Sequence, residues 1–243
     1  MNPSSPRLSG LSASFPAHNE EDNVVPMIDE LLAALPQVAE EFEIIVVDDG
    51  SRDRTRERAE ERARTDPRIR VVHHPVNRGY GAAVWSGLTA GRMPYAFFTD
   101  GDRQFDVRQI ATLLPQIEGH DAVIGWRVNR QDPLIRRINA HLWNALVRLT
   151  FGLAVRDVDC AFKLFRRDIL EGLEIHCGGA TFSTELLTRV QRRGGRLAQV
   201  PVLHRPRTSG AASGGSPRVI LRAFRELARL RVELWREAPT GRH

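Results

Sequence analysis

Short runs of β-branched and apolar residues alternate with longer, helix-like segments over the first half of the chain. The apolar runs are residues 11–15, 43–47, 69–73, 95–99 and 122–126. The segments between them are residues 23–35, 52–65, 80–91 and 107–117. Strands that alternate with helices of about ten or more residues are typical of a mostly parallel, doubly wound sheet. We therefore expect an α/β fold with helices on both faces of a central sheet.

The second half of the chain is less regular. Its predicted elements are helices over residues 133–149 and 183–193, a turn and strand over residues 157–165, and a last strand over residues 197–203. The helix over residues 133–149 carries an apolar stripe wide enough to face a core. We expect one domain over residues 8–205 and a separate C-terminal part over residues 206–243.

That C-terminal part combines a Ser/Gly/Arg loop with an amphipathic helix that opens at Pro217, a residue well tolerated in the first helical turn. One face of the helix holds Ile220, Ala223, Phe224, Leu227, Leu230 and Leu234, and another holds Arg218, Arg222, Arg225, Arg229 and Arg236. Two interpretations are open. The helix binds in a membrane interface, or it packs on its own domain and exposes the arginine face to solvent.

Carboxylates follow several of the predicted strands. Ligands of open α/β sheets bind beyond the carboxyl ends of the strands, so these residues are candidates for function. Asp100 and Asp102 follow one apolar run, with Gln104 two residues further on. Divalent ions such as Mg²⁺ prefer oxygen ligands and are commonly held by one or two carboxylates together with substrate phosphates. Asp-Gly-Asp is also a common turn sequence, and the residues by themselves leave both interpretations open.

Asp48 and Asp49 end another strand, where a carboxylate can accept hydrogen bonds from ribose hydroxyls or a base edge. The glycine-rich motifs of dinucleotide-binding dehydrogenases and of P-loop NTPases are absent from the sequence. We therefore expect a nucleotide site of another kind.

Charge is distributed unevenly along the 243 residues. Hydrophobic residues make up 42% and charged residues 27%, a composition that argues against a wholly disordered chain. The net charge is +5, and residues 201–243 hold nine arginines against three glutamates. A basic tail on a nearly neutral body predicts an acidic partner, such as a membrane surface, nucleic acid or phosphorylated substrate. Lys163 is the only lysine, which marks it for attention.

Cysteine content and apolar runs bear on localisation. Cys160 and Cys177 are too few for a disulfide framework and lack a metal-binding CxxC pattern. Residues 1–10 have no apolar signal-peptide core, and no apolar run approaches the roughly 18 to 20 residues that span a bilayer. We expect a cytoplasmic protein without a spanning segment.

Taken in order, these motifs resemble the family 2 glycosyltransferases with the GT-A fold, a Rossmann-like nucleotide-diphospho-sugar transferase fold. Within that family the chain is similar to the dolichol-phosphate mannosyltransferase-like branch of polyprenyl-phosphate glycosyltransferases. The resemblance covers nearly the whole chain. The matching segments are residues 15–21 (FPAHNEE), 46–51 (VVDDGS), 77–83 (NRGYGAA), 100–102 (DGD), 125–127 (GWR), 157–167 (DVDCAFKLFRR), 183–187 (STELL) and 200–205 (VPVLHR).

The resemblance implies a metal-dependent, inverting transfer of a hexose, with mannose or glucose preferred. The donor would be a GDP- or UDP-sugar, the cofactor Mg²⁺ or Mn²⁺, and the acceptor a polyprenyl phosphate at the cytoplasmic membrane face. Carried over by position, the donor-binding residues are Pro16, Ala17, Asn19, Glu20, Asp48, Asp49, Arg78 and Asp100. The implied metal ligands are Asp100, Asp102 and Gln104. The implied acceptor-binding residues are Arg127, Arg205 and Ser213, and the implied catalytic residues are Asp102, Arg127, Asp159, Lys163 and Glu185.

The need for a general base depends on the acceptor. A phosphate monoester has a second pKa of about 6 and is largely ionised at neutral pH, so it requires no strong base. A neutral hydroxyl would have to be activated by Asp159 or Glu185. The sequence permits either case.

Two alternatives remain beside the lipid-phosphate acceptor. The first is a family 2 enzyme that acts on a soluble small molecule or a glycan. The second is a non-catalytic module that binds a nucleotide or nucleic acid through the basic tail. The tail lacks the interleaved aromatics of single-strand binders, which argues against a nucleic-acid partner. Peripheral contact with the inner face of the cell membrane is expected only for the lipid-phosphate enzyme.

Overall fold

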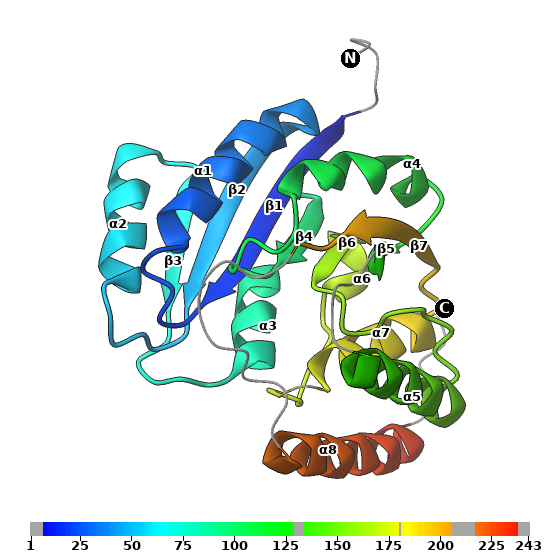
Figure 1. The fold of residues 1–243 in the computed structure, drawn as a ribbon. Helices are drawn as coiled ribbons and strands as arrows, with labels where there is room; N and C mark the ends of the chain where they lie inside the picture. The colour runs from blue at the N-terminus through cyan, green and yellow to red at the C-terminus, as the bar shows by residue number, and fades with distance from the viewer. Residues whose placement is uncertain (1–6, 129–133, 180, 206–216, 238–243) are drawn as a thin grey trace.

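The computed structural model describes residues 7–128, 134–179, 181–205 and 217–237. The strands in these residues are β1 (Leu8–Ala17), β2 (Ala39–Asp48), β3 (Ile69–His73), β4 (Tyr95–Thr99), β5 (Ala122–Val128), β6 (Phe162–Arg166) and β7 (Leu197–Leu203). The α-helices are α1 (Val24–Ala34), α2 (Thr55–Thr65), α3 (Tyr80–Ala90), α4 (Leu114–Ile117), α5 (Leu134–Phe151), α6 (Arg167–Leu170), α7 (Phe182–Arg192) and α8 (Pro217–Arg236). Figure 1 shows their arrangement.

The strands form one seven-stranded sheet in the order β3-β2-β1-β4-β6-β5-β7. β6 runs antiparallel to its neighbours β4 and β5, whereas the other pairings are parallel. The expected mostly parallel sheet is therefore confirmed. In this register Lys163 of β6 lies between Phe98 of β4 and Ile124 of β5, so the only lysine of the chain sits in the middle of the sheet.

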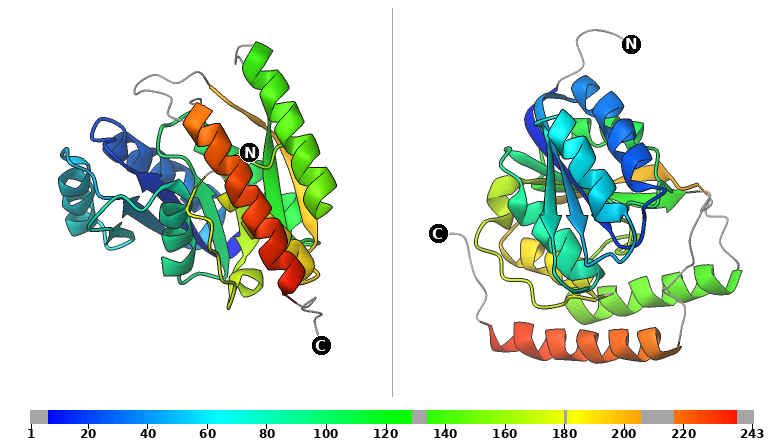
Figure 2. Two further views of the ribbon diagram at one scale, coloured as in Figure 1. Left: turned by 90° about the horizontal axis from the view of Figure 1, so that it is seen from below. Right: turned by 90° about the vertical axis from the view of Figure 1, so that its left-hand side faces the viewer.

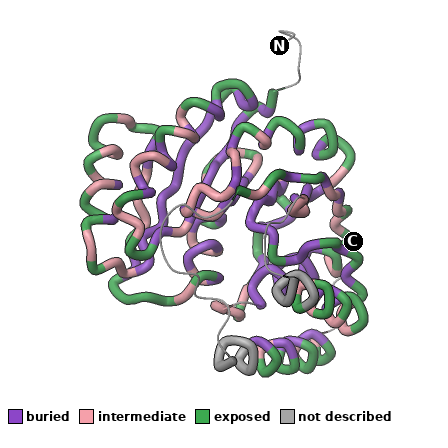
Figure 3. The backbone as a smooth tube through the Cα atoms, in the orientation of Figure 1, coloured by how far each residue is buried: buried purple, intermediate pink, exposed green. Residues whose placement is uncertain are grey.

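Helices cover both faces of the sheet, as the alternating pattern predicts. On one face Val47 of β2 packs with Ala83 of α3. Successive side chains of a strand point to opposite faces. Val46 accordingly joins the larger core cluster that contains Met27 of α1. Figures 2 and 3 show α1 and α2 over one face and the buried strands between the helical layers.

The expected helix over residues 107–117 is interrupted. The chain forms a 3-10 helix over Val107–Thr112 and then the short helix α4 over Leu114–Ile117. Pro115 explains the break, because proline lacks an N–H and clashes with the preceding turn, whereas it fits the first turn of a new helix.

The described part of α8 packs on the rest of the chain. Ala223, Leu227, Leu230 and Leu234 are buried, and the ring of Phe224 meets that of Trp143 in α5 edge-on at 6.0 Å between centroids. α5 and α8 lie side by side along one side of the molecule (Figures 1 and 2). This favours the packed-helix interpretation for the apolar face. Among the described residues, no helix has the length and apolar character needed to cross a membrane.

Candidate functional site

A cleft of about 440 Å³ opens at the carboxyl ends of β1, β2 and β4. The ends of parallel strands meet at one edge of a sheet, which brings together motifs that are far apart in sequence. The residues that line the cleft are Pro16, Ala17, His18, Glu20, Asp49, Asn77, Gly79, Tyr80, Ala83, Asp100, Gly101 and Asp102. Six of the residues expected at the donor or metal site lie in this lining: Pro16, Ala17, Glu20, Asp49, Asp100 and Asp102.

Asp100 and Asp102 share the end of β4. Burial raises the pKa of Asp100 to about 7, and the negative charge of Asp102 adds to that shift. Tyr80 interacts with Asp100: desolvation of the phenol and the charge of that carboxylate raise the pKa of Tyr80 well above its usual value, and Tyr80 in turn lowers the pKa of Asp100. Neighbouring carboxylates repel each other when both are ionised, so the doubly ionised state is disfavoured. A divalent cation would offset that repulsion, so the donor set fits a Mg²⁺ or Mn²⁺ ion.

Gln104 and Arg205 lie next to the carboxylate pair and are joined to each other. Asp102 Oδ1 accepts a 3.1 Å hydrogen bond from the backbone N–H of Gln104, while Gln104 Nε2 donates to the carbonyl oxygen of Arg205 at 3.0 Å. The guanidinium of Arg205 binds Asp106, with Nη2 2.7 Å from Oδ2. The structure therefore places Gln104 beside the expected metal ligands and Arg205 at the outer side of the same loop.

Asp49 organises the loop that leads into α3. Its carboxylate accepts 2.9 Å hydrogen bonds from the backbone N–H groups of Arg78 and Gly79, and it lies 2.7 Å from His74 Nδ1. The side chain of Arg78 is exposed. Asp48 is fully buried and lies 2.8 Å from His73 Nδ1, so it contacts the neighbouring strand rather than the cleft.

Asn19 and Glu20 tie the loop after β1 to the loop after β2. Asn19 has φ +54° and its N–H donates to Ser51 Oγ at 3.0 Å. The N–H of Glu20 donates to Thr55 Oγ1 at 2.8 Å, and its carboxylate accepts a 2.6 Å hydrogen bond from Asn23. Of this pair, Glu20 lines the cleft.

A second group of charges lies beside the carboxylate pair. Arg127 of β5 binds Asp157 through two hydrogen bonds, Nε to Oδ2 at 2.7 Å and Nη2 to Oδ1 at 2.8 Å. Burial lowers the pKa of Arg127, but the hydrogen bonds and charge of Asp157 outweigh burial and raise it. Asp159 is exposed as a residue; desolvation of its carboxyl group and the charge of Asp157 raise its pKa to about 6.

Lys163 is fully buried beneath this group. Its ammonium donates hydrogen bonds to the carbonyl oxygen of Cys160 and, at 3.3 Å, to Ser183 Oγ, and lies 5.1 Å from the ring centroid of Phe98. Burial lowers the pKa of Lys163, and the charges of Asp159 and its neighbours oppose that shift. In turn, the charge of Lys163 lowers the pKa of Asp100, which couples it to the carboxylate pair across the sheet.

The placement of Glu185 corrects one expectation. Glu185 is fully buried in α7, where its carboxylate accepts hydrogen bonds from the N–H groups of His176 and Cys177 and from Arg189 Nε. A carboxylate enclosed by these donors is out of reach of an acceptor hydroxyl. Glu185 therefore does not fit the role of general base, which leaves Asp159 as the candidate. Ser213, expected at the acceptor site, lies outside the described residues.

Several residues of the site were not assigned a role from sequence, among them Asn77, Tyr80 and Asp157. Tyr80 and Asn77 line the cleft, and Asp157 holds Arg127. All three lie inside motifs already recognised in the chain, in residues 77–83 and 157–167. Their place in these motifs marks them as candidates from the sequence alone. Which residue each side chain contacts, however, depends on the folded structure.

Comparison with known proteins agrees with this geometry. Residues 12–173 match the model of the family described as "Glycosyl transferase family 2". The chain belongs to glycosyl transferase family 2. Within that family it is 30% identical over 208 residues to the undecaprenyl-phosphate 4-deoxy-4-formamido-L-arabinose transferase of Pectobacterium carotovorum, covering 84% of this chain and 62% of that protein.

Two further proteins are similar to the chain, one in sequence and one in structure. The dodecaprenyl-phosphate galacturonate synthase of Rhizobium johnstonii is 30% identical, with 88% of this chain and 63% of that protein covered. The family 2 chain thus spans about three-fifths of the length of these curated relatives. The glucosyl-3-phosphoglycerate synthase of Mycobacterium tuberculosis, solved with Mn²⁺, UDP-glucose and phosphoglyceric acid, aligns with a TM-score of 0.69 at 22% identity, covering 92% of this chain and 80% of that one. This structural likeness confirms the expected GT-A fold.

Proposed function

We propose that the protein is an inverting, metal-dependent glycosyltransferase that moves a hexose from a GDP- or UDP-sugar to a polyprenyl phosphate. The observation that carries this proposal is the pairing of Asp100 with Asp102 in a cleft that Asp49 also lines. To bind a nucleoside diphosphate, a protein needs a side chain that contacts the ribose or base and a site that accommodates the charged phosphates. Relatives at 30% identity that are named for transfer to undecaprenyl or dodecaprenyl phosphate support the acceptor class.

In this proposal the residues of the cleft have different roles. Asp100 and Asp102, with the side-chain oxygen of Gln104, hold the divalent ion. When bound, that ion neutralises the negative charge that develops on the leaving nucleoside diphosphate. Asp49 fixes the start of α3 and faces the nucleoside. Lys163 places a positive charge under the carboxylates, which favours the ionised form of Asp100 that binds a cation.

The acceptor is assigned to the side of the cleft where Arg127 and Arg205 lie. Each is held by a carboxylate, Asp157 for Arg127 and Asp106 for Arg205, so each guanidinium has a fixed direction. A phosphate acceptor is its own nucleophile once ionised. Asp159, with its pKa raised to about 6, is mostly ionised at neutral pH and is the candidate base when the acceptor is a hydroxyl.

The proposed membrane contact involves α5 and α8. Among the described side chains of these helices, the large exposed apolar ones are Leu142, Leu149, Phe224, Val232 and Trp235. Arg225 and Arg229 are exposed on α8 as well. A surface that mixes large apolar side chains with arginines suits the interface of an anionic bilayer. Peripheral binding at the cytoplasmic membrane face would bring the cleft to the lipid-linked phosphate.

The proposal is tested by incubating the protein with Mg²⁺ or Mn²⁺ and a panel of nucleotide sugars, with and without polyprenyl phosphate. We expect sugar transfer to the lipid phosphate with one donor, and loss of transfer when the metal is chelated. Transfer to a soluble acceptor but not to polyprenyl phosphate would contradict the acceptor assignment. Transfer that continues fully with the metal chelated would contradict the metal assignment.

A further inference from the structure

Residues 174–179, the segment between α6 and α7, pack against the loop that opens α3 beside the cleft. The N–H of Gly81 donates a 2.9 Å hydrogen bond to the carbonyl oxygen of Gly178. A Cβ atom at Gly79 would lie 2.9 Å from that oxygen, and one at Gly81 would lie 2.8 Å from the carbonyl oxygen of Cys177. The two backbones are therefore in direct contact, with no space for side chains between them.

The start of α3 carries groups of the proposed donor site. The N–H of Gly79 donates to Asp49, and Tyr80 lines the cleft together with Asp49 and Asp100. Because Gly79 and Gly81 contact the 174–179 segment, its position determines where these groups lie. A displacement of the segment would move the start of α3 relative to both carboxylates.

α7 contacts the segment through Glu185. The N–H groups of His176 and Cys177 donate to the Glu185 carboxylate at 3.1 and 2.7 Å. Arg189 Nε lies 2.7 Å from Glu185 and compensates its buried charge. Glu185 thus fixes the backbone of the segment, and its burial is explained by this role.

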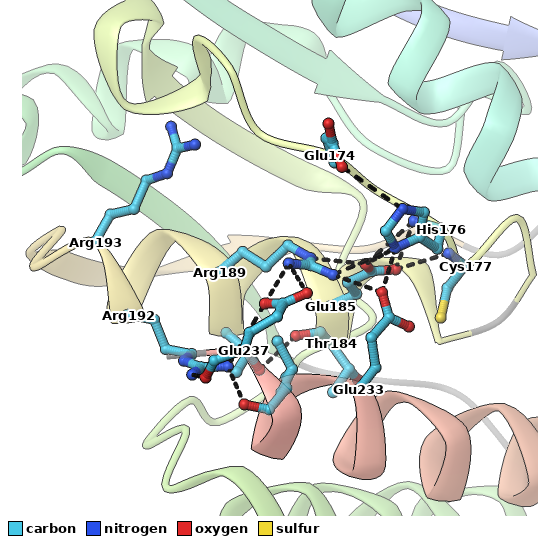
Figure 4. A network of polar contacts seen from close by, with 12 residues as sticks. Glu174, His176, Cys177, Thr184, Glu185, Arg189, Arg192, Arg193, Glu233 and Glu237 are labelled. Atoms are coloured by element: carbon cyan, nitrogen blue, oxygen red, sulfur yellow. Dashed lines mark hydrogen bonds and ion pairs between the residues drawn. The ribbon is translucent and has the colours of Figure 1, made fainter. Parts of the chain in front are cut away.

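α8 also contacts the segment, close to the contacts made by α7 (Figure 4). Glu233 Oε1 contacts His176 Nδ1 and lies 3.0 Å from Arg189 Nη2. Near the start of α7, Thr181 Oγ1 donates a 2.7 Å hydrogen bond to Glu226, and a Cβ at Gly179 would lie 2.8 Å from both oxygens of that carboxylate. Two glutamates, seven residues apart on α8, therefore lie against this part of the chain, Glu233 at His176 and Glu226 at Gly179 and Thr181.

We propose that Glu226 and Glu233 are positioning residues for the nucleotide-sugar site, acting through residues 174–179. The inference rests on the proposed function for the identity of the ligand, but the contact between α8, the segment and α3 is independent of it. A C-terminal helix outside the cleft thereby sets the affinity of the cleft for its nucleotide.

The test compares two ways of weakening the attachment of α8. The double variant Glu226→Ala with Glu233→Ala removes the contacts to the segment. The control, Arg192→Met, removes hydrogen bonds of 2.6 and 2.9 Å from Arg192 to the carbonyl oxygens of Leu234 and Glu237, at the end of α8. Both changes loosen α8, and only the first acts on residues 174–179 and Thr181.

Hydrogen exchange of peptides that cover residues 77–83 gives a readout that needs no ligand. We expect faster exchange in the double variant and wild-type exchange in Arg192→Met. Binding of UDP and of GDP with Mn²⁺ gives the second readout, and we expect the dissociation constant to rise between about twofold and thirtyfold in the double variant only. The pair Glu226→Gln and Glu233→Gln keeps hydrogen-bonding side chains and should show a smaller effect, and it replaces the alanine pair if that pair fails to fold.

Unchanged exchange and unchanged affinity in both glutamate pairs would overturn the proposal. Equal losses in the double variant and in Arg192→Met would also overturn it, because they would reflect the attachment of α8 in general. A wild-type protein that binds neither UDP nor GDP would contradict the proposed function instead, and the exchange data would still report on the contact itself.

Discussion

Arg127 and Asp157 form a two-pronged ion pair in which both side chains are largely buried, with exposed fractions of 17% and 8%. The pair joins β5 to the turn that precedes β6. It also fixes the direction of a guanidinium assigned to the acceptor phosphate. Planar bidentate pairing of this kind gives a specific geometry that a lysine cannot reproduce.

Replacing one partner of this pair should be strongly destabilising. Asp157→Asn leaves the Arg127 charge buried without its counter-ion, and we expect the free energy of unfolding to fall by about 3–5 kcal/mol. Urea denaturation measures the effect. Glu57→Gln, which breaks the exposed pair between Arg54 and Glu57, is the control and should change stability little. A loss in Asp157→Asn no larger than in this control would contradict the prediction.

Asp102→Asn should weaken metal binding. The variant removes one charged oxygen ligand while retaining the volume of the side chain, so we expect the dissociation constant for Mn²⁺ to rise at least about tenfold. Calorimetric titration of the protein with Mn²⁺ measures it. Glu118→Gln is the matched control, because Glu118 is an exposed carboxylate just before β5, at the opposite end of the sheet. Equal Mn²⁺ affinity in both variants would remove Asp102 from the proposed site.

The metal-free protein should lose stability as the pH rises from about 4 to about 7. Burial and Asp102 raise the pKa of Asp100 from 3.8 to about 7. The folded state therefore binds this proton more tightly than the unfolded state, and its contribution is full below pH 4 and lost through pH 7. The contribution is at most about 4 kcal/mol. Urea denaturation in EDTA measures it by comparison with Asp100→Asn, which carries no titrating group at this position: the stability of the wild type relative to the variant should fall across this range, and a constant difference would count against the raised pKa.

Substitutions of Lys163 test whether a compact buried cation is needed at this position. Lys163→Arg inserts a larger, planar group into a filled space, and we expect a loss of about 1–3 kcal/mol in unfolding free energy. Lys163→Met keeps the volume but removes the charge that lowers the pKa of Asp100 and Asp159. The pH at which the metal-free protein loses stability should consequently move upward in Lys163→Met. An unshifted profile would show that the ammonium does not act on these carboxylates.

Vesicle binding tests the proposed membrane surface. At about 1 kcal/mol per arginine, Arg225→Gln with Arg229→Gln should weaken binding to anionic vesicles about thirtyfold. Co-sedimentation with phosphatidylglycerol vesicles at low salt measures the change. Arg56→Gln with Arg64→Gln removes the same charge from the exposed side of α2 and should bind as the wild type does. Equal loss in both pairs would mean that net charge, rather than the surface of α8, causes binding.

Much of the fold follows from local patterns. The strands over Ile69–His73, Tyr95–Thr99 and Leu197–Leu203 begin and end where the sequence predicts, because each apolar run is bounded by polar or turn-forming residues. The prediction over residues 107–117 was wrong in one respect. The apolar spacing suggested a single helix, whereas the backbone sterics of Pro115 produce two short helices.

The sequence by itself determined the order of strands and helices, the family and the carboxylates placed after each strand, because these depend on short-range periodicity and on motifs in a fixed order. Only the tertiary structure decided which charges meet. Asp157 lies 30 residues from Arg127, and Glu233 lies 44 residues from Arg189, so no local pattern pairs them. The same is true of Glu185: whether a carboxylate acts as a base or as a buried anchor depends on the donors that distant elements bring to it.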